Sequence, residues 1–270
     1  MKKLLFVLVI IPLLISCSQY QKLLKSTDYE LKYTKAMEYY EAEDFMRAAT
    51  LFNELQSIYR GTDKSEIISF TYSKCLYGLS DYIMAGHYFR QFYKTFPSSD
   101  YAEECQFMSA YCYYMVSPKP RLDQTDTYNA INEFQLFINL YPKSPKVEEA
   151  ERLITELRDK LVYKSYLSAK LYFNLGNYMG NNYQSAVIAA QNSLKEFPDT
   201  KYREELSFLI LEAKYIQAEN SVLEKKEDRM REAIDEYYSF INEFPKSDYM
   251  DKAVKIFEHA SKEVKFEEVN

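Results

Sequence analysis

One phrase returns four times in this sequence: an aromatic residue, a proline, a few polar residues and then one or two acidic residues. The four copies are FPSSDYAEE (96–104), YPKSPKVEE (141–149), FPDTKYREE (197–205) and FPKSDYMD (244–251). An alanine lies twelve residues before each proline, at Ala85, Ala130, Ala186 and Ala233. This shared spacing predicts an internal structural repeat, and it constrains the fold more than any other feature.

A fifth copy lacks the proline but keeps the spacing, with Ala48 twelve residues before Arg60 and with Gly61 next. In each copy the positions four and seven after the alanine are mostly apolar, so the three positions share one helix face. A proline cannot continue a helix and disfavours helical geometry in the residue before it. We therefore expect each of these helices to end at the aromatic residue. A serine, threonine or aspartate is expected to cap the next helix.

A second helix is expected upstream of each alanine, most clearly around Ala36 and Tyr39 and around Ala169 and Tyr172. A helix pair with small residues at fixed points and a closing proline resembles the tetratricopeptide repeat. The predicted fold class is all-α: a tetratricopeptide-repeat α-solenoid of about five helix pairs plus a C-terminal capping helix.

The N-terminal residues predict a signal peptide over 1–16. A basic start, MKK, precedes an apolar run over 4–15 that is too short to span a bilayer. The run ends in the letters LISC, which resemble the lipobox of bacterial lipoproteins, and by that resemblance Cys17 becomes the lipidated first residue of the mature protein. The alternative is an ordinary secretory signal with a coincidental cysteine.

The repeats then divide the rest of the chain. The expected segments are a lipidated tether (17–27), N-terminal repeats one to three (28–142), repeats four and five with a long connecting helix and the capping helix (143–264), and a tail (265–270). Asp28 is expected to cap the first helix, and the connecting helix is expected to run from Lys146 to Tyr178 because no proline interrupts it. Two interruptions are expected as well, an exposed loop over 116–126 and a charged insert over 223–228.

Residues that could support enzymatic chemistry are scarce. The five glycines form no phosphate-binding loop, and the two histidines, His87 and His259, stand outside any metal-ligand spacing. The acidic pairs of the repeated phrase fall in first helical turns, where carboxylates interact favourably with the helix dipole. We expect no catalytic site, no metal and no cofactor. A net charge of -6 also argues against a nucleic-acid partner.

Three cysteines follow Cys17, at Cys75, Cys105 and Cys112, and none belongs to a CxxC pair. Cys105 and Cys112 lie seven residues apart, about 10 Å along one helix, which is too far for a disulfide. We expect all three thiols to be free and mostly buried.

A peptide-binding face is expected on the inner curve of repeats one to three. The chain holds 27 tyrosines and 17 phenylalanines, more than core packing alone demands. Arrays of this type resemble one another in presenting the first helix of each repeat on the inner curve. The eight residues expected there are Tyr33, Tyr40, Phe70, Lys74, Tyr77, Phe107, Tyr111 and Tyr114. Aromatic rings beside a lysine suit an extended peptide with an apolar end and a carboxylate, whereas the alternative is that these residues pack against the long helix.

The lipobox followed by five such repeats resembles the BamD family of outer-membrane assembly lipoproteins, and the resemblance covers nearly the whole chain. It implies a non-enzymatic subunit of the β-barrel assembly (BAM) complex, lipid-anchored in the outer membrane and facing the periplasm. The implied partners are a BamA-like barrel subunit, other assembly-complex subunits and unfolded barrel proteins. N-terminal repeats would receive substrates, and C-terminal repeats would dock partners.

Two other functions are alternatives to the one that this resemblance implies. An envelope scaffold for cell division or peptidoglycan machinery can also carry tetratricopeptide repeats, but related members place a coiled coil before fewer repeats, and no sustained heptad is present here. Glycan capture in the manner of SusD lipoproteins would call for a longer chain with surface tryptophans, and this chain has no tryptophan.

Overall fold

The structure is a computed structural model that describes residues 19–264, and every regular element among those residues is an α-helix. The expected signal peptide, Cys17 and the tail 265–270 lie outside the described residues. The chain divides into two compact units. Of the described residues, 19–118 and Thr125–Ile154 form the first unit, and Lys119–Gln124 joins residues 155–264 in the second.

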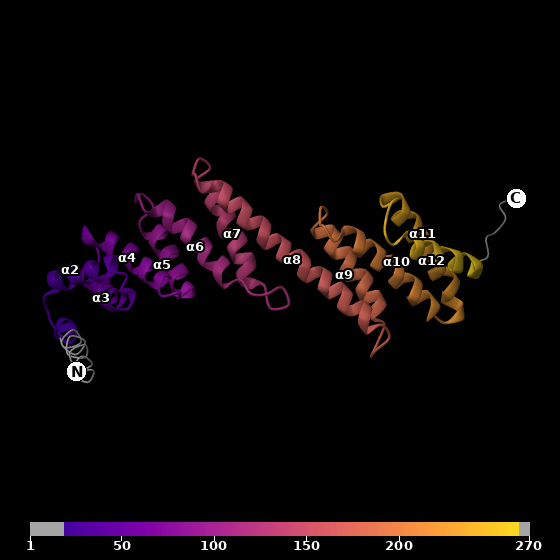
Figure 1. Cartoon of the computed structure of the whole chain (residues 1–270), viewed down its shortest axis with the longest axis horizontal. Helices are drawn as coiled ribbons and strands as arrows, with labels where there is room; N and C mark the ends of the chain where they lie inside the picture. Colours follow the sequence, from indigo (N-terminus) through magenta and orange to yellow (C-terminus); the bar gives the residue numbers. More distant parts are fainter. Residues whose placement is uncertain (1–18, 265–270) are drawn as a thin grey trace, which may run out of the picture. The chain divides into compact units, whose positions relative to one another are not determined.

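The first unit contains one helix pair for each of repeats one to three. The pairs are α2 (Tyr29–Glu41) with α3 (Phe45–Ile58), α4 (Lys64–Gly78) with α5 (Tyr82–Thr95), and α6 (Ala102–Val116) with α7 (Thr125–Leu140). Each helix from α2 to α6 contacts the next one along the chain (Figure 1). This succession of contacts is the stacking of tetratricopeptide repeats.

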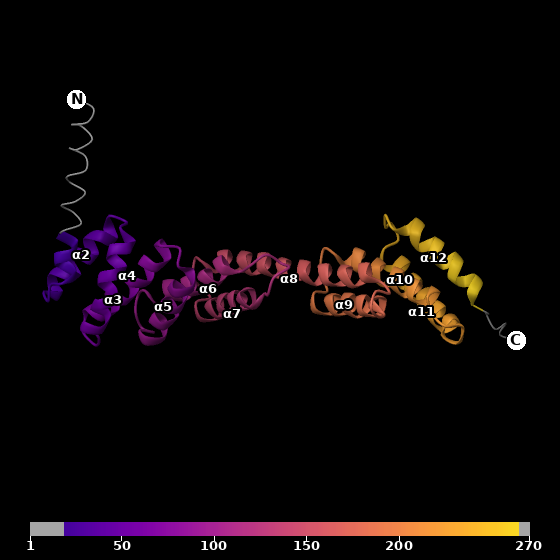
Figure 2. The same ribbon diagram turned by 90° about the horizontal axis from the view of Figure 1, so that it is seen from below.

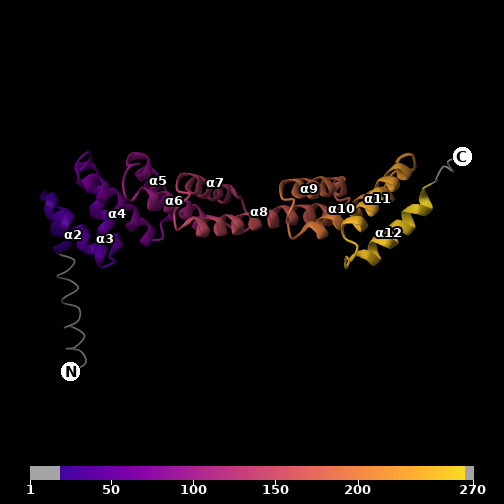
Figure 3. The same ribbon diagram turned by 90° about the horizontal axis from the view of Figure 1, so that it is seen from above.

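One long helix, α8 (Val147–Leu175), begins in the first unit and continues into the second, which confirms the predicted uninterrupted helix. The second unit continues with α9 (Asn182–Glu196), α10 (Arg203–Glu219), α11 (Leu223–Glu243) and α12 (Met250–Glu263). Helix α10 contacts α9, α11 and α12, and α11 also packs on α12 (Figures 2 and 3). The chain is therefore an all-α protein of the tetratricopeptide-repeat solenoid class.

The alanine spacing marks buried positions of the repeat. The alanines of all five copies have no exposed surface: Ala48, Ala85, Ala130, Ala186 and Ala233. The residues four and seven positions later are also buried in each copy. Helices α5, α9 and α11 end one residue before the aromatic of the phrase, which confirms the predicted stop.

The predicted caps are correct at Asp28 but wrong for the repeated phrase. The Asp28 carboxylate accepts a hydrogen bond from the Leu31 amide at 2.9 Å. Helices α6, α10 and α12 instead begin after a tyrosine whose side chain makes no capping bond. In these phrases the Ser or Thr hydroxyl accepts a hydrogen bond from the amide two residues later; the Tyr101 amide, for example, donates to the Ser99 hydroxyl. The resulting turn delays the start of the helix.

The expected loop over 116–126 is present between α6 and α7. The charged insert over 223–228, however, is not a separate insert, because it forms the first turns of α11. Its residues are good helix formers without proline or glycine. The Lys226 ammonium group lies between the carboxylates of Glu219 and Glu263, at 3.5 and 3.1 Å, and so ties this turn to α10 and α12.

Candidate functional site

A side chain of each repeated phrase covers an aromatic ring on the first helix of its own repeat. This side chain stands four residues after the proline, or after Arg60 in the first copy. The Lys64 and Lys146 ammonium groups lie over Tyr33 and Phe107, at 4.6 and 4.3 Å from the ring centroids. In the other three copies a tyrosine stacks on the ring: Tyr101 on Phe70 at 4.3 Å, Tyr202 on Tyr166 at 4.7 Å and Tyr249 on Phe208 at 4.5 Å.

Three of the eight residues predicted to bind peptide are therefore already covered. Tyr33, Phe70 and Phe107 pack against residues of the repeated phrase, and Phe107 is only 3% exposed because it also contacts Phe134 and Phe137. For Phe107 the structure favours packing over ligand contact, whereas Tyr33 and Phe70 have one covered face and remain half-buried. The covering residues belong to the phrase that closes each repeat. They do not belong to the long helix, against which the alternative interpretation of the sequence places these rings.

A glutamate in the first turn of the first helix joins successive copies of the repeat. In three copies the serine hydroxyl donates a hydrogen bond to a glutamate in the first turn of the preceding first helix: Ser99 to Glu66, Ser144 to Glu103 and Ser247 to Glu204. Hydrogen bonds to charged groups are worth more than neutral ones. The structure thus gives these carboxylates a role in holding neighbouring repeats together.

The other five predicted residues form what we call the inner-face ladder: Tyr40, Lys74, Tyr77, Tyr111 and Tyr114, on α2, α4 and α6. The ring centroids of Tyr77 and Tyr111 are 6.4 Å apart, and those of Tyr111 and Tyr114 are 5.5 Å apart. Each of the five side chains is half-buried. The structure therefore brings Tyr77 and Tyr111, from successive first helices, into ring contact, with Tyr114 beside Tyr111.

The lysine of the ladder already has a carboxylate partner. The Lys74 ammonium lies 2.7 Å from a Glu104 carboxylate oxygen, and both side chains are partly exposed. Burial raises the pKa of the nearby Tyr40 hydroxyl, and the negative charge of Glu104 adds to this while Lys74 opposes it. A peptide carboxylate at Lys74 would therefore compete with Glu104, which the sequence did not reveal.

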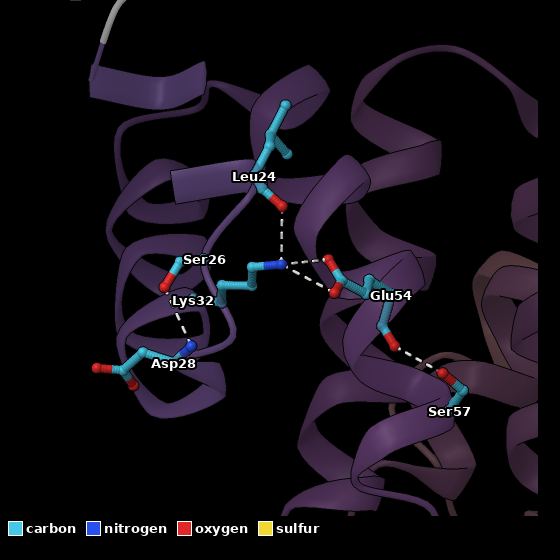
Figure 4. A network of polar contacts seen from close by, with 6 residues as sticks. All are labelled: Leu24, Ser26, Asp28, Lys32, Glu54 and Ser57. Atoms are coloured by element: carbon cyan, nitrogen blue, oxygen red, sulfur yellow. Dashed lines mark hydrogen bonds and ion pairs between the residues drawn. The ribbon is translucent and has the colours of Figure 1, made fainter. Parts of the chain in front are cut away.

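The segment 19–24 is fixed to repeat one. Residues 19–24 are helical, Leu23 is buried, and the Tyr20 ring meets Tyr39 edge-on at 5.8 Å. The Lys32 ammonium, on a side chain only 1% exposed, donates to the Leu24 carbonyl at 3.0 Å and to both Glu54 carboxylate oxygens at 2.7 and 2.8 Å (Figure 4). A buried charge needs this degree of pairing.

The chemical groups expected to be inactive are indeed enclosed. Cys75, Cys105 and Cys112 are free and buried, as predicted. Burial raises the pKa of Cys75 and Cys112 to about 12 and raises that of Cys105 as well, so the reactive thiolate is disfavoured. Within residues 19–264 no group of ligands could hold a metal ion. In the same part of the chain no helix has the length and apolar character needed to cross a membrane.

The second unit exposes apolar side chains that the sequence analysis did not single out. Tyr178 and Met179, in the turn before α9, are 68% and 90% exposed, and Val222 and Leu223, at the start of α11, are 61% and 88% exposed. A hydrogen bond between the Gln217 and Gln184 side chains joins the two helix ends that carry these turns. The apolar residues stand in turns, outside the helical spacing on which the sequence interpretation relied.

Comparisons with known proteins point to one family. The model of the YfiO family, described as outer membrane lipoprotein, matches residues 26–206. No curated protein matches the chain. A solved structure, the "TPR2AB-domain:pHSP90-complex of yeast Sti1", is similar at a TM-score of 0.37 and 12% identity, covering 86% of this chain and 98% of that one. A likeness this weak carries no argument about function.

Proposed function

We propose a function from the premise that this chain belongs to the YfiO family of outer membrane lipoproteins, whose well-known member is BamD. The chain acts as a non-enzymatic subunit of the BAM complex, where it scaffolds a BamA-like barrel subunit and receives unfolded barrel proteins. The observation that carries the proposal is the family match over 26–206, which includes the helices of the inner-face ladder.

The anchor in this proposal is a lipid on Cys17, with the protein on the periplasmic side of the outer membrane. Tyr20 stands three residues after Cys17, so the two α-carbons lie within about 11 Å of each other. Lys32 and Tyr39 hold this segment on repeat one. Anchoring at Cys17 would therefore keep repeat one close to the membrane surface.

Substrate binding is assigned to the inner-face ladder. Tyrosines offer a large contact area with little rotamer entropy to lose, and an aromatic C-terminal peptide of a barrel protein would lie along the row. The covered rings of Tyr33, Phe70 and Phe107 support the helices that carry the ladder. Lys74 adds a cation at one side, shared with Glu104.

Partner docking is assigned to the second unit. Its turns expose Met179 and Leu223 almost fully, together with Tyr178 and Val222. Neighbouring exposed apolar side chains of this kind mark protein contact sites. The BamA-like subunit is the partner that we place there, with the remaining assembly-complex subunits on other surfaces.

Two experiments test the proposal. Cys17→Ala should give a folded protein that no longer fractionates with the outer membrane, and sedimentation with urea-stripped membranes would contradict the anchor. A pull-down from solubilised outer membrane should recover a BamA-like barrel protein. Recovery of cell-division or peptidoglycan proteins in its place would favour the envelope-scaffold alternative.

A Met179→Asp, Leu223→Asp double variant refines the pull-down. It places two charges on the exposed apolar turns and should abolish recovery of the barrel subunit while the helical circular dichroism spectrum stays unchanged. Unchanged recovery would contradict the assignment of docking to these turns.

A further inference from the structure

The second unit contains a cavity of about 640 Å³ between the segment 119–124 and α8. Its lining includes Arg121 from that segment and Tyr163, Lys164, Tyr166, Lys170 and Leu171 from α8. The size is within the range of small ligand sites. The residues that line this cavity are not part of the predicted peptide-binding face, and the family match assigns no site to them.

The segment that forms one wall is held in a defined conformation. The Gln124 side chain is 3% exposed, and its amide donates to the carbonyls of Lys119 and Leu122 at 2.9 and 3.1 Å. The Lys164 ammonium donates to the same Leu122 carbonyl at 2.6 Å. The wall is thus fixed by side-chain hydrogen bonds before any ligand arrives, which reduces the entropy lost on binding.

The cavity gathers positive charge in a chain that is acidic overall. Arg121, Lys164 and Lys170 all line it, and no aspartate or glutamate does. Within the described part of the chain these three cations form no ion pair, although Lys164 still bonds the Leu122 carbonyl and Lys170 lies 5.7 Å from the Tyr166 ring centroid. Many other cations of the protein, such as Lys32 and Lys214, do have carboxylate partners. The unmatched charge calls for an anionic ligand.

The cavity also offers apolar contact. The rings of Tyr163, Tyr166 and Tyr202 form one cluster, in which the Tyr166 centroid lies 6.3 Å from that of Tyr163 and 4.7 Å from that of Tyr202, while Tyr163 and Tyr202 are 5.6 Å apart. The Tyr166 ring is thus held in place. Leu171 is 58% exposed and Tyr163 is 37% exposed. A ligand that brought only negative charge would leave these apolar surfaces in water.

We propose that this cavity binds an acidic segment of a partner protein, one in which an aromatic or large aliphatic side chain stands between carboxylates. The apolar side chain would lie against Tyr163 and Leu171, and the carboxylates would meet Arg121, Lys164 and Lys170. A protein segment fits better than a membrane surface, because a concave site with an apolar wall accepts a protruding side chain. The inference goes beyond the proposed function and requires neither the lipid anchor nor the barrel subunit.

The test measures binding by fluorescence anisotropy to the detergent-solubilised full chain. The probe is a short labelled peptide that alternates glutamate with phenylalanine, and the matched peptide has lysine at every glutamate. The variant Arg121→Glu, Lys170→Glu reverses two of the three charges, both on exposed side chains. The control Lys225→Glu, Lys246→Glu makes the same change in net charge at exposed positions of the same unit that do not line the cavity.

The acidic peptide should bind and the lysine peptide should not. The Arg121→Glu, Lys170→Glu variant should weaken binding by roughly tenfold or more, and the control by less than about twofold, because only the former places the charges at contact distance. Equal affinity of the two double variants would overturn the proposal.

Two further arms complete the test. A peptide with alanine in place of phenylalanine should bind more weakly, and so should Leu171→Ala with the original peptide; unchanged affinity in both would overturn the apolar half. Phosphatidylglycerol vesicles form the last arm. If vesicle binding depends on Arg121 and Lys170 while the peptide does not bind, the cluster belongs to the membrane surface and the proposal fails.

Discussion

Lysines on the first helices of the repeats have different charge partners in the two units. In the first unit the Lys74 ammonium is neutralised by Glu104 at 2.7 Å, within a row of half-buried tyrosines. In the second unit Lys164 and Lys170 line a cavity without any carboxylate. The difference indicates two kinds of recognition. The inner-face ladder would select ligands mainly by aromatic contact, and the cavity would select them by charge.

The packing that supports these surfaces is shared by both units. A residue of the repeated phrase covers an aromatic ring in all five copies, and the register alanine is fully buried in all five. The repeat therefore explains stability in the two units alike. Function has to come from the positions at which the copies differ.

The largest effect is expected when this shared packing is disturbed. Ala130→Leu in the first unit and Ala186→Leu in the second should each destabilise the protein by roughly 1 to 3 kcal/mol, because both sites have no room for a larger side chain. Thermal melts measure the loss, and hydrogen exchange identifies the unit that loosens. Asn132→Leu and Asn192→Leu, at exposed positions of the same helices, are the controls. Equal melts for variants and controls would show that the alanines do not mark tight contacts.

The next effect is a difference in stability between replacing a lysine that has a carboxylate partner, Lys32, and replacing one that has none among the described residues, Lys170. Lys32→Met should cost about 1 to 2 kcal/mol, because it removes the bonds to Leu24 and Glu54 while Glu54, at 40% exposure, keeps part of its hydration. The helix over 19–24 should then exchange amide hydrogens faster. Lys170→Met in the second unit should leave stability unchanged, since that side chain is exposed and has no ion pair among the described residues. Equal stability losses would remove the contrast between the units.

The features that were predictable from the sequence are local ones. A proline ends a helix through its own geometry, and an alanine that recurs at fixed spacing marks a contact that every copy makes. The helix face assigned to the eight predicted residues rested on the resemblance to tetratricopeptide arrays. The resemblance did not reveal which side chains cover that face, because the covering side chain comes from the end of the repeat. The signal was nevertheless visible, since lysine or tyrosine stands four residues after the proline, or after Arg60, in every copy.

Other features had no sequence signal. Lysine is among the residues least often buried, so nothing marked Lys32 as an internal residue. The cavity depends on the approach of Arg121 and Leu122 to Lys164, across more than forty residues of sequence. The helix propensity of residues 223–228 was visible in the sequence, but their attachment to α10 and α12 depends on Glu219 and Glu263, which lie outside that segment.

A smaller effect is expected at the inner-face ladder, where each anchor contact is worth roughly 1 kcal/mol or more. Tyr40→Ala with Tyr77→Ala should weaken binding of an aromatic C-terminal barrel peptide, measured by calorimetry, without loss of the barrel subunit in a pull-down. Lys74→Ala should add little, because Glu104 already satisfies that lysine. Glu104→Gln should strengthen binding by releasing Lys74 for the peptide carboxylate.

Salt completes this comparison of the two surfaces. Added salt should weaken the ladder complex only partly and the acidic-peptide complex of the cavity strongly, because three unpaired cations act in the cavity.

Unchanged peptide affinity in the tyrosine double variant would reassign Tyr40 and Tyr77 to packing.

The smallest effect concerns Glu212 in the second unit. Unlike Glu104, which pairs with Lys74 in the first unit, Glu212 forms no ion pair among the described residues. Burial raises the pKa of Glu212, and the positive charge of Lys252 offsets this only in part. Because the folded pKa lies above the unfolded value, the folded protein binds this proton more tightly. The contribution to stability is therefore present at low pH and is lost as the pH rises through the folded pKa.

At neutral pH the Glu212 charge thus opposes folding, and Glu212→Gln should raise the melting temperature slightly. The gain should vanish near about pH 4, where the parent carboxyl is largely protonated. Differential scanning calorimetry across this range measures the change, and Glu232→Gln, an exposed glutamate on α11, is the control. A lower melting temperature at neutral pH would mean that the attraction between Glu212 and Lys252 outweighs burial. Lys252 would then stabilise the Glu212 charge as Glu104 stabilises Lys74 in the first unit, and the cavity cations would still have no ion pair among the described residues.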